Sequence, residues 1–125
     1  MALQVQIVRI TPIGNQVRVS FNVIPSGNYT TGIGGDPLNF ANAIADPSFF
    51  GAVASIPSSQ GPVDLDVWDV GGNLANGVFP VKGSTQANSA VKFSSAFNTE
   101  LGTGPYPASI LNSVLEGEAV FTTNQ

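Results

Sequence analysis

Residues 16–24, "QVRVSFNVI", decide the fold of this chain. Apolar and polar side chains alternate from Gln16 to Val23, and the alternating apolar residues are Val17, Val19, Phe21 and Val23. A period of two places these four side chains on one face of a β-strand and the polar ones on the other. The stretch therefore predicts a half-buried strand.

The preceding residues 3–10, "LQVQIVRI", repeat the pattern with Leu3, Val5 and Ile7. Between the two runs lies "TPIGNQ", in which Gly14-Asn15 suits a turn with positive φ. Two alternating runs around a short turn predict an antiparallel hairpin.

The rest of the chain predicts further short strands separated by turns. Alternating or apolar runs occupy 63–70, 78–83, 90–97 and 113–123. Residues 37–44 fit an edge strand or a loose turn, and Pro80 suits an edge strand. Residues 25–36 and 98–109 are rich in residues that break strands, and "GGNLANG" at 71–77 fits a turn.

One short helix is predicted over 45–56, with Asp46 at the N-cap and Pro47 at the first helical position. The whole chain, 1–125, therefore predicts a single all-β antiparallel domain, a sandwich or jelly-roll-like fold with at most one or two short helical turns. We expect its core to contain Val17, Val19, Phe21, Val23, Phe93 and Phe121.

The composition excludes several classes of function. Charged residues make up 10% of the chain, against about 25% in a typical soluble domain. The cations are Arg9, Arg18, Lys82 and Lys92, too few and too scattered to bind nucleic acid. No apolar run is long enough to cross a membrane, and the N-terminus predicts a strand rather than a signal peptide, so synthesis in a host cytoplasm is expected. A surface with few charges is cheap to desolvate and favours permanent assembly, as a dimer or trimer.

The residue types also limit the chemistry. The chain has no His and no Cys, which excludes histidine- and cysteine-based catalytic and zinc sites. "GIGGDP" at 32–37 lacks the helix and the Lys-Ser/Thr pair of phosphate-binding loops. We expect Gly32, Gly34, Gly35 and Asp36 to form a structural hinge between the hairpin and the rest of the domain. No catalytic residue, cofactor site or metal site is predicted.

The stretch "DLDVWD" at 64–69 has two interpretations. Its aspartates could gather Ca²⁺, but Asp64 and Asp66 fit a solvated strand face better. Trp68 shares their face and is therefore a candidate contact residue. Glu116 and Glu118 also share an outer strand face, an arrangement common in half-exposed strands and no indication of a glycosidase.

Four sequence blocks, in order, resemble a family of small proteins of tailed bacteriophages. They are "YTTGIGGDPLNF" at 29–40, "GPVDLDVWDVGG" at 61–72, "AVKFSSAF" at 90–97, and "ELGTGPYPASIL" before "VLEGEAVF" at 100–121. The family is similar to head decoration, or cement, proteins, which are often encoded beside the major capsid protein and have jelly-roll-like β folds. This chain departs from the family pattern at Ile33, Pro37 and Ala90.

The resemblance implies a structural protein on the outer surface of the virion capsid that stabilises the shell by bridging major capsid protein subunits. An alternative is a carbohydrate- or receptor-binding β module that uses Tyr29, Trp68 and Tyr106 as stacking platforms. Another is a tail or head-completion protein of the same virion.

Overall fold

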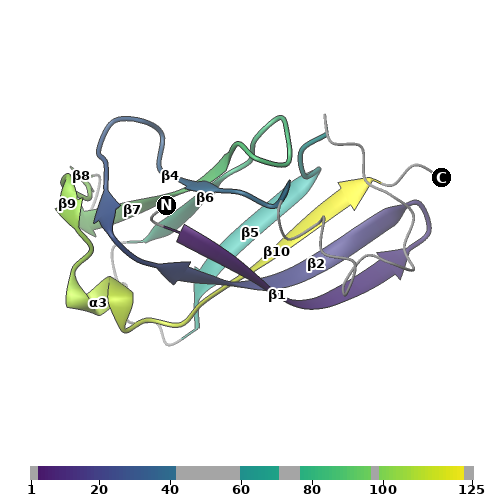
Figure 1. The fold of residues 1–125 in the computed structure, drawn as a ribbon, viewed down its shortest axis with the longest axis horizontal. Helices are drawn as coiled ribbons and strands as arrows, with labels where there is room; N and C mark the ends of the chain where they lie inside the picture. The colour runs from purple at the N-terminus through teal and green to yellow at the C-terminus, as the bar shows by residue number, and fades with distance from the viewer. Residues whose placement is uncertain (1–2, 42–59, 71–76, 97–98, 123–125) are drawn as a thin grey trace.

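The computed structural model describes residues 3–41, 60–70, 77–96 and 99–122, which form an antiparallel all-β fold together with the short helix α3 (Ala108–Leu111) (Figure 1). The predicted all-β class is therefore confirmed, while the more specific sandwich or jelly-roll arrangement stays a prediction. The helix predicted over 45–56 and most of the turn predicted over 71–77 lie outside the described residues.

One sheet, which we call the long-strand sheet, contains the predicted hairpin. Its strand order is β1-β2-β10-β5, and every neighbouring pair is antiparallel. The strands are β1 (Leu3–Ile13), β2 (Gln16–Pro25), β10 (Leu115–Thr122) and β5 (Asp64–Asp69). Gly14, in the turn between β1 and β2, has a φ of 62°, as the sequence predicts for this turn.

A β-bulge interrupts the pairing of β1 with β2. Ile7 lies opposite Phe21, but Arg9 lies opposite Ser20, so Val8 is an extra residue on β1. On a regular strand Ile10 would point outward, but the extra residue turns it to the inner face, where it packs against the core. The bulge explains why Ile7 and Ile10, three positions apart, both point inward.

A second sheet, which we call the short-strand sheet, has the order β4-β7-β6, and β8 also pairs with β7. Its strands are β4 (Asp36–Leu38), β7 (Ser89–Ala96), β6 (Val78–Val81) and β8 (Thr99–Glu100). β4 and β6 occupy the edge positions predicted from the sequence. A separate ladder joins β3 (Asn28–Tyr29) to β9 (Gly104–Pro105), inside segments predicted to be irregular.

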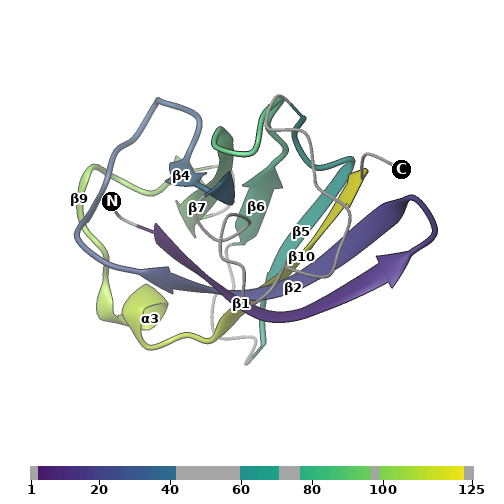
Figure 2. The same ribbon diagram turned by 45° about the vertical axis from the view of Figure 1, so that its right-hand side comes forward.

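The two sheets form two layers that share one apolar core (Figure 2). All six predicted core residues are buried, each at most 3% exposed: Val17, Val19, Phe21, Val23, Phe93 and Phe121. Phe40, which follows β4, joins the layers, because its ring makes edge contacts with Phe21 at 5.1 Å and Phe121 at 5.6 Å between ring centroids. Aromatic side chains from both layers therefore pack against one another in the core.

Candidate functional site

The glycine-rich loop and the segment 100–106 are joined by hydrogen bonds at one end of the molecule. The Thr31 N–H donates to Thr103 Oγ1 at 2.9 Å, and the Thr31 hydroxyl donates to the Leu101 carbonyl oxygen. The Gly32 N–H donates to a carboxylate oxygen of Glu100 at 3.3 Å. We call the contact between residues 29–36 and 100–106 the loop junction; it unites two of the sequence blocks that carry the phage-protein resemblance.

Two tyrosine–carboxylate pairs anchor the loop junction from inside. The Tyr29 hydroxyl donates to Glu100 Oε2 at 2.6 Å, and the Tyr106 hydroxyl donates to Asp36 Oδ2. Asp36 is 3% exposed, so its hydrogen bond lies out of reach of bulk water. Burial raises the pKa of both tyrosine hydroxyls above the ordinary value, and the hydrogen bonds to the carboxylates raise each pKa further.

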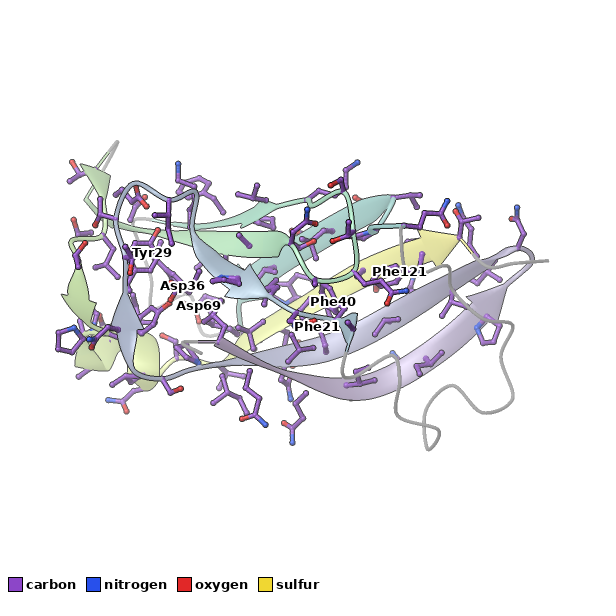
Figure 3. The ribbon with its side chains drawn as sticks, turned by 45° about the horizontal axis from the view of Figure 1, so that its top comes forward. Phe21, Tyr29, Asp36, Phe40, Asp69 and Phe121 are labelled. Atoms are coloured by element: carbon purple, nitrogen blue, oxygen red, sulfur yellow. The ribbon has the colours of Figure 1, made fainter. Side chains whose placement is uncertain are left out.

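The rings of Tyr29, Phe93 and Tyr106 pack against one another in an aromatic cluster. Their centroids lie 5.4 to 6.0 Å apart with near-perpendicular planes, the edge-to-face geometry that aromatic pairs prefer. Figure 3 shows Tyr29 and Asp36 towards one end of the molecule, away from Phe21, Phe40 and Phe121. The loop junction is therefore a packed structural element, with the Tyr106–Asp36 hydrogen bond buried and the hydrogen bonds of Thr31 and Gly32 at the surface.

Two predicted contact residues are buried in this cluster. Tyr29 is 0% and Tyr106 is 3% exposed, so the prediction that they form surface platforms is wrong. Both lie in segments predicted to be irregular. Their rings nevertheless pack in the core, and their hydroxyl groups donate hydrogen bonds to Glu100 and Asp36. Trp68 is 40% exposed on the outer face of β5, as predicted. The structure does not bring the three aromatic residues together on one surface.

The glycine-rich loop has the backbone geometry predicted for it. Gly32, Gly34 and Gly35 have φ values of 88°, 93° and 104°, in the region that favours glycine. A Cβ atom on Gly35 would also lie 2.6 Å from the Val91 carbonyl oxygen. Asp36 differs from the prediction, because it is the first residue of β4, buried and paired with Tyr106, and so does not belong to a hinge.

The acidic residues of β5 and β10 do not assemble into a metal site. Asp64 and Asp66 are exposed and lie on the same face of β5, as expected for a solvated strand. Among the described residues, no group of three or more acidic side chains could hold a metal ion. Arg18 of β2 forms an exposed ion pair with Glu118 of β10, with 3.4 Å between Nε and Oε1.

Large apolar side chains are exposed on the outer faces of both sheets. Phe79 and Val81, 51% and 38% exposed, belong to β6 of the short-strand sheet. Ile24, Trp68, Val70 and Val114, each at least 40% exposed, lie at one end of the long-strand sheet. The sequence reasoning singled out Trp68 and missed the others, although the same alternation that predicts the core places Ile24 outward.

Comparison with known proteins gives no relative: no protein-family model matches the chain, and no curated protein or solved structure shows significant similarity to it. In the part of the chain that the structure describes, no helix is long and apolar enough to cross a membrane. The exposed apolar side chains and the hydrogen-bonded loop junction make the outer faces of the two sheets and the loop junction the candidate functional features.

Proposed function

We propose that the protein is a structural virion protein that decorates a phage capsid and stabilises it by bridging major capsid protein subunits. The observation that carries the proposal is the exposure of large apolar side chains on both outer faces of a chain with 10% charged residues. Exposed apolar patches of this kind mark surfaces that bind other macromolecules. The four sequence blocks that resemble decoration proteins favour the major capsid protein as the partner.

The paired loop junction supports this role. Its hydrogen bonds join residues about 70 positions apart, and the one between Tyr106 and Asp36 is buried. A module whose loops are fixed in this way loses little conformational freedom when it binds, which favours affinity. Many such modules bound at symmetry-related places on one shell would stabilise it through many small contacts.

The proposal is tested by binding to DNA-free, expanded shells assembled from the major capsid protein of the phage from which, on this proposal, the chain comes. The purified protein is added at low salt and at 1 M NaCl, and the bound fraction is measured by co-sedimentation. We expect binding at both salt concentrations, because at 1 M the Debye length is about 3 Å and an apolar interface does not depend on exposed charges. Binding lost at 1 M NaCl, or absent at both, contradicts the proposal.

A matched pair of variants tests whether apolar contacts hold the protein on the shell. Phe79 and Ile13 are both 51% exposed, but Phe79 lies on the short-strand sheet and Ile13 beside the β1–β2 turn. We expect Phe79→Ser to weaken binding and Ile13→Ser to leave it unchanged. Binding to isolated tails rather than shells would instead favour the tail-protein alternative.

A further inference from the structure

The outer face of the long-strand sheet divides its charges between two pairs of strands. The outward side chains that lie opposite one another on neighbouring strands form rows across the sheet. The ladders define four such rows, and each crosses the strands in the order β1, β2, β10, β5. Cations lie on the first two strands and carboxylates on the last two: Arg9 and Arg18 against Glu116, Glu118, Asp64 and Asp66. Glu118 lies directly opposite Asp66, and like charges in such a pair repel. Arg18 already forms an ion pair with Glu118 within the chain, so a cation brought by a partner would be most favourable beside Asp66.

One end of the same face is apolar. Leu115 pairs with Val23 and with Asp69, so the residues next to these, Ile24, Val114 and Val70, form a row across three strands. The Val70 N–H donates to the Val114 carbonyl oxygen at 2.9 Å, which continues the ladder through this row. All three side chains are exposed, by 43%, 57% and 53%.

Two further apolar side chains extend this row. Trp68 lies in the next row on β5, and Leu111 of α3 lines an open pocket with Ile24 and Val114. Figures 1 and 2 show α3 at the end of the sheet where β2 ends and β10 begins. We call Ile24, Trp68, Val70, Leu111 and Val114 the apolar end of the face.

A single symmetry operation makes this face complementary to itself. Consider a twofold axis that lies in the interface between two copies and runs parallel to the strands. It places β1 of one copy opposite β5 of the other, and β2 opposite β10. Each row of one copy then lies opposite the same row of the other copy. Under this operation the cationic half of one copy covers the acidic half of the other, and the apolar ends meet. Such a self-complementary patch is what a twofold dimer interface requires.

We infer that the outer face of the long-strand sheet is a homodimer interface, in which a second copy of this chain packs face to face about that axis. The row geometry then pairs Ile24 of each copy with Val114 of the other, and Arg9 of each copy with Asp66 of the other. Sheets that pack face to face keep their strands within about 30° of each other, as this axis requires. The inference does not depend on the proposed function, and it leaves Phe79 and Val81 free for another partner.

The size of the face fits a reversible dimer. Four strands about 4.8 Å apart and eight residues with a rise of about 3.4 Å each give a footprint of about 500 Å² per copy. Two copies bury about 1,000 Å², close to the lower limit for a specific interface. Interfaces at this lower limit are typical of weak, reversible complexes, so we expect a dissociation constant in the micromolar range.

Analytical ultracentrifugation of the full chain at about 100 µM tests the inference. We expect a dimer, and we expect Ile24→Asp to raise the dissociation constant at least tenfold. Val81→Asp places the same charge on the other sheet and is expected to leave the dimer intact. A monomer, a trimer, or a dimer that Ile24→Asp does not weaken overturns the inference.

A charge swap tests the axis itself. Arg9→Asp and Asp66→Arg are each expected to weaken the dimer, and the double variant to restore it, because the swapped charges again face each other across the axis. Within one chain the strands of these residues are three spacings apart, about 14 Å, so a restored interaction must come from the second copy. Failure of the double variant to recover dimerisation overturns the proposed geometry. Circular dichroism of every variant checks that the β fold is retained.

Discussion

The pairing of Tyr106 with Asp36 predicts a large loss of stability for a change of one oxygen atom. Tyr106→Phe removes the hydroxyl that donates to Asp36 but keeps the ring, which contacts Tyr29 and Phe93. Asp36 is 3% exposed, so water cannot replace the lost donor without opening the loop junction. The variant therefore isolates one buried hydrogen bond to a carboxylate.

The magnitude follows from the burial of the acceptor. A hydrogen bond to a charged group contributes about 1.5–3 kcal/mol, and a buried acceptor left unsatisfied costs about 1–3 kcal/mol. We expect Tyr106→Phe to lower the free energy of unfolding by about 2–3 kcal/mol. For a domain of this size, the corresponding fall in Tm is roughly 6–15 °C. Tyr29→Phe is the matched comparison: its partner, Glu100, is half-buried and closer to solvent, so we expect a loss of about 1 kcal/mol or less.

Urea unfolding at pH 7, followed by circular dichroism, measures both variants against the wild-type chain. Equal m-values would show that the denatured states are comparable, so that the difference in midpoint reports on the folded state. Equal losses for Tyr106→Phe and Tyr29→Phe, or a loss below about 0.5 kcal/mol for Tyr106→Phe, would refute the claim that the Asp36 pair is a buried anchor.

Three further predictions concern stability. Because the pKa of both tyrosine hydroxyls is raised, their contribution is complete below about pH 10 and is lost above it at about 1.4 kcal/mol per pH unit for each tyrosine. In an alkaline titration, phenolate absorbance should appear only together with unfolding, and a smooth titration of the folded protein near pH 10 would contradict this. Gly34→Ala should cost about 1 kcal/mol through its positive φ alone, and Gly35→Ala clearly more, because its Cβ would also meet Val91; equal thermal shifts would count against the close contact. Gly117→Ala should lower Tm as well, since its Cβ would lie 2.4 Å from the Phe21 ring; an unchanged Tm would mean that the ring can move at no cost.

The sequence predicts the strands well because period-two alternation is a local signal. The four alternating apolar residues Val17, Val19, Phe21 and Val23 are all buried, and the predicted turn at Gly14 has positive φ. The spacing of Ile7 and Ile10 in the sequence is consistent with the bulge at Val8, because two residues three positions apart cannot both face inward on a regular strand.

The loop junction could not be predicted in the same way. β3 and β9 contain two residues each, too few for any periodic pattern, and they pair across more than 70 positions of sequence. Tyr29 and Tyr106 lie in segments rich in strand breakers, where side chains are usually exposed. Their burial depends on Asp36 and Glu100 accepting their hydroxyl hydrogens, and that pairing exists only in three dimensions.

The edges of the sheets explain why association should occur through faces and not through added strands. Exposed edges invite pairing with other chains, and a chain with few charges has little repulsion to prevent it. Here the bulge at Val8 interrupts β1, while Pro37 in β4 and Pro80 in β6 remove backbone donors from the two edge strands of the short-strand sheet. These features hinder strand addition at β1, β4 and β6, while the outer faces of the sheets keep exposed apolar side chains. Because strand addition is hindered at these edges while Ile24, Val114 and Phe79 are exposed, association through the faces of the sheets is favoured.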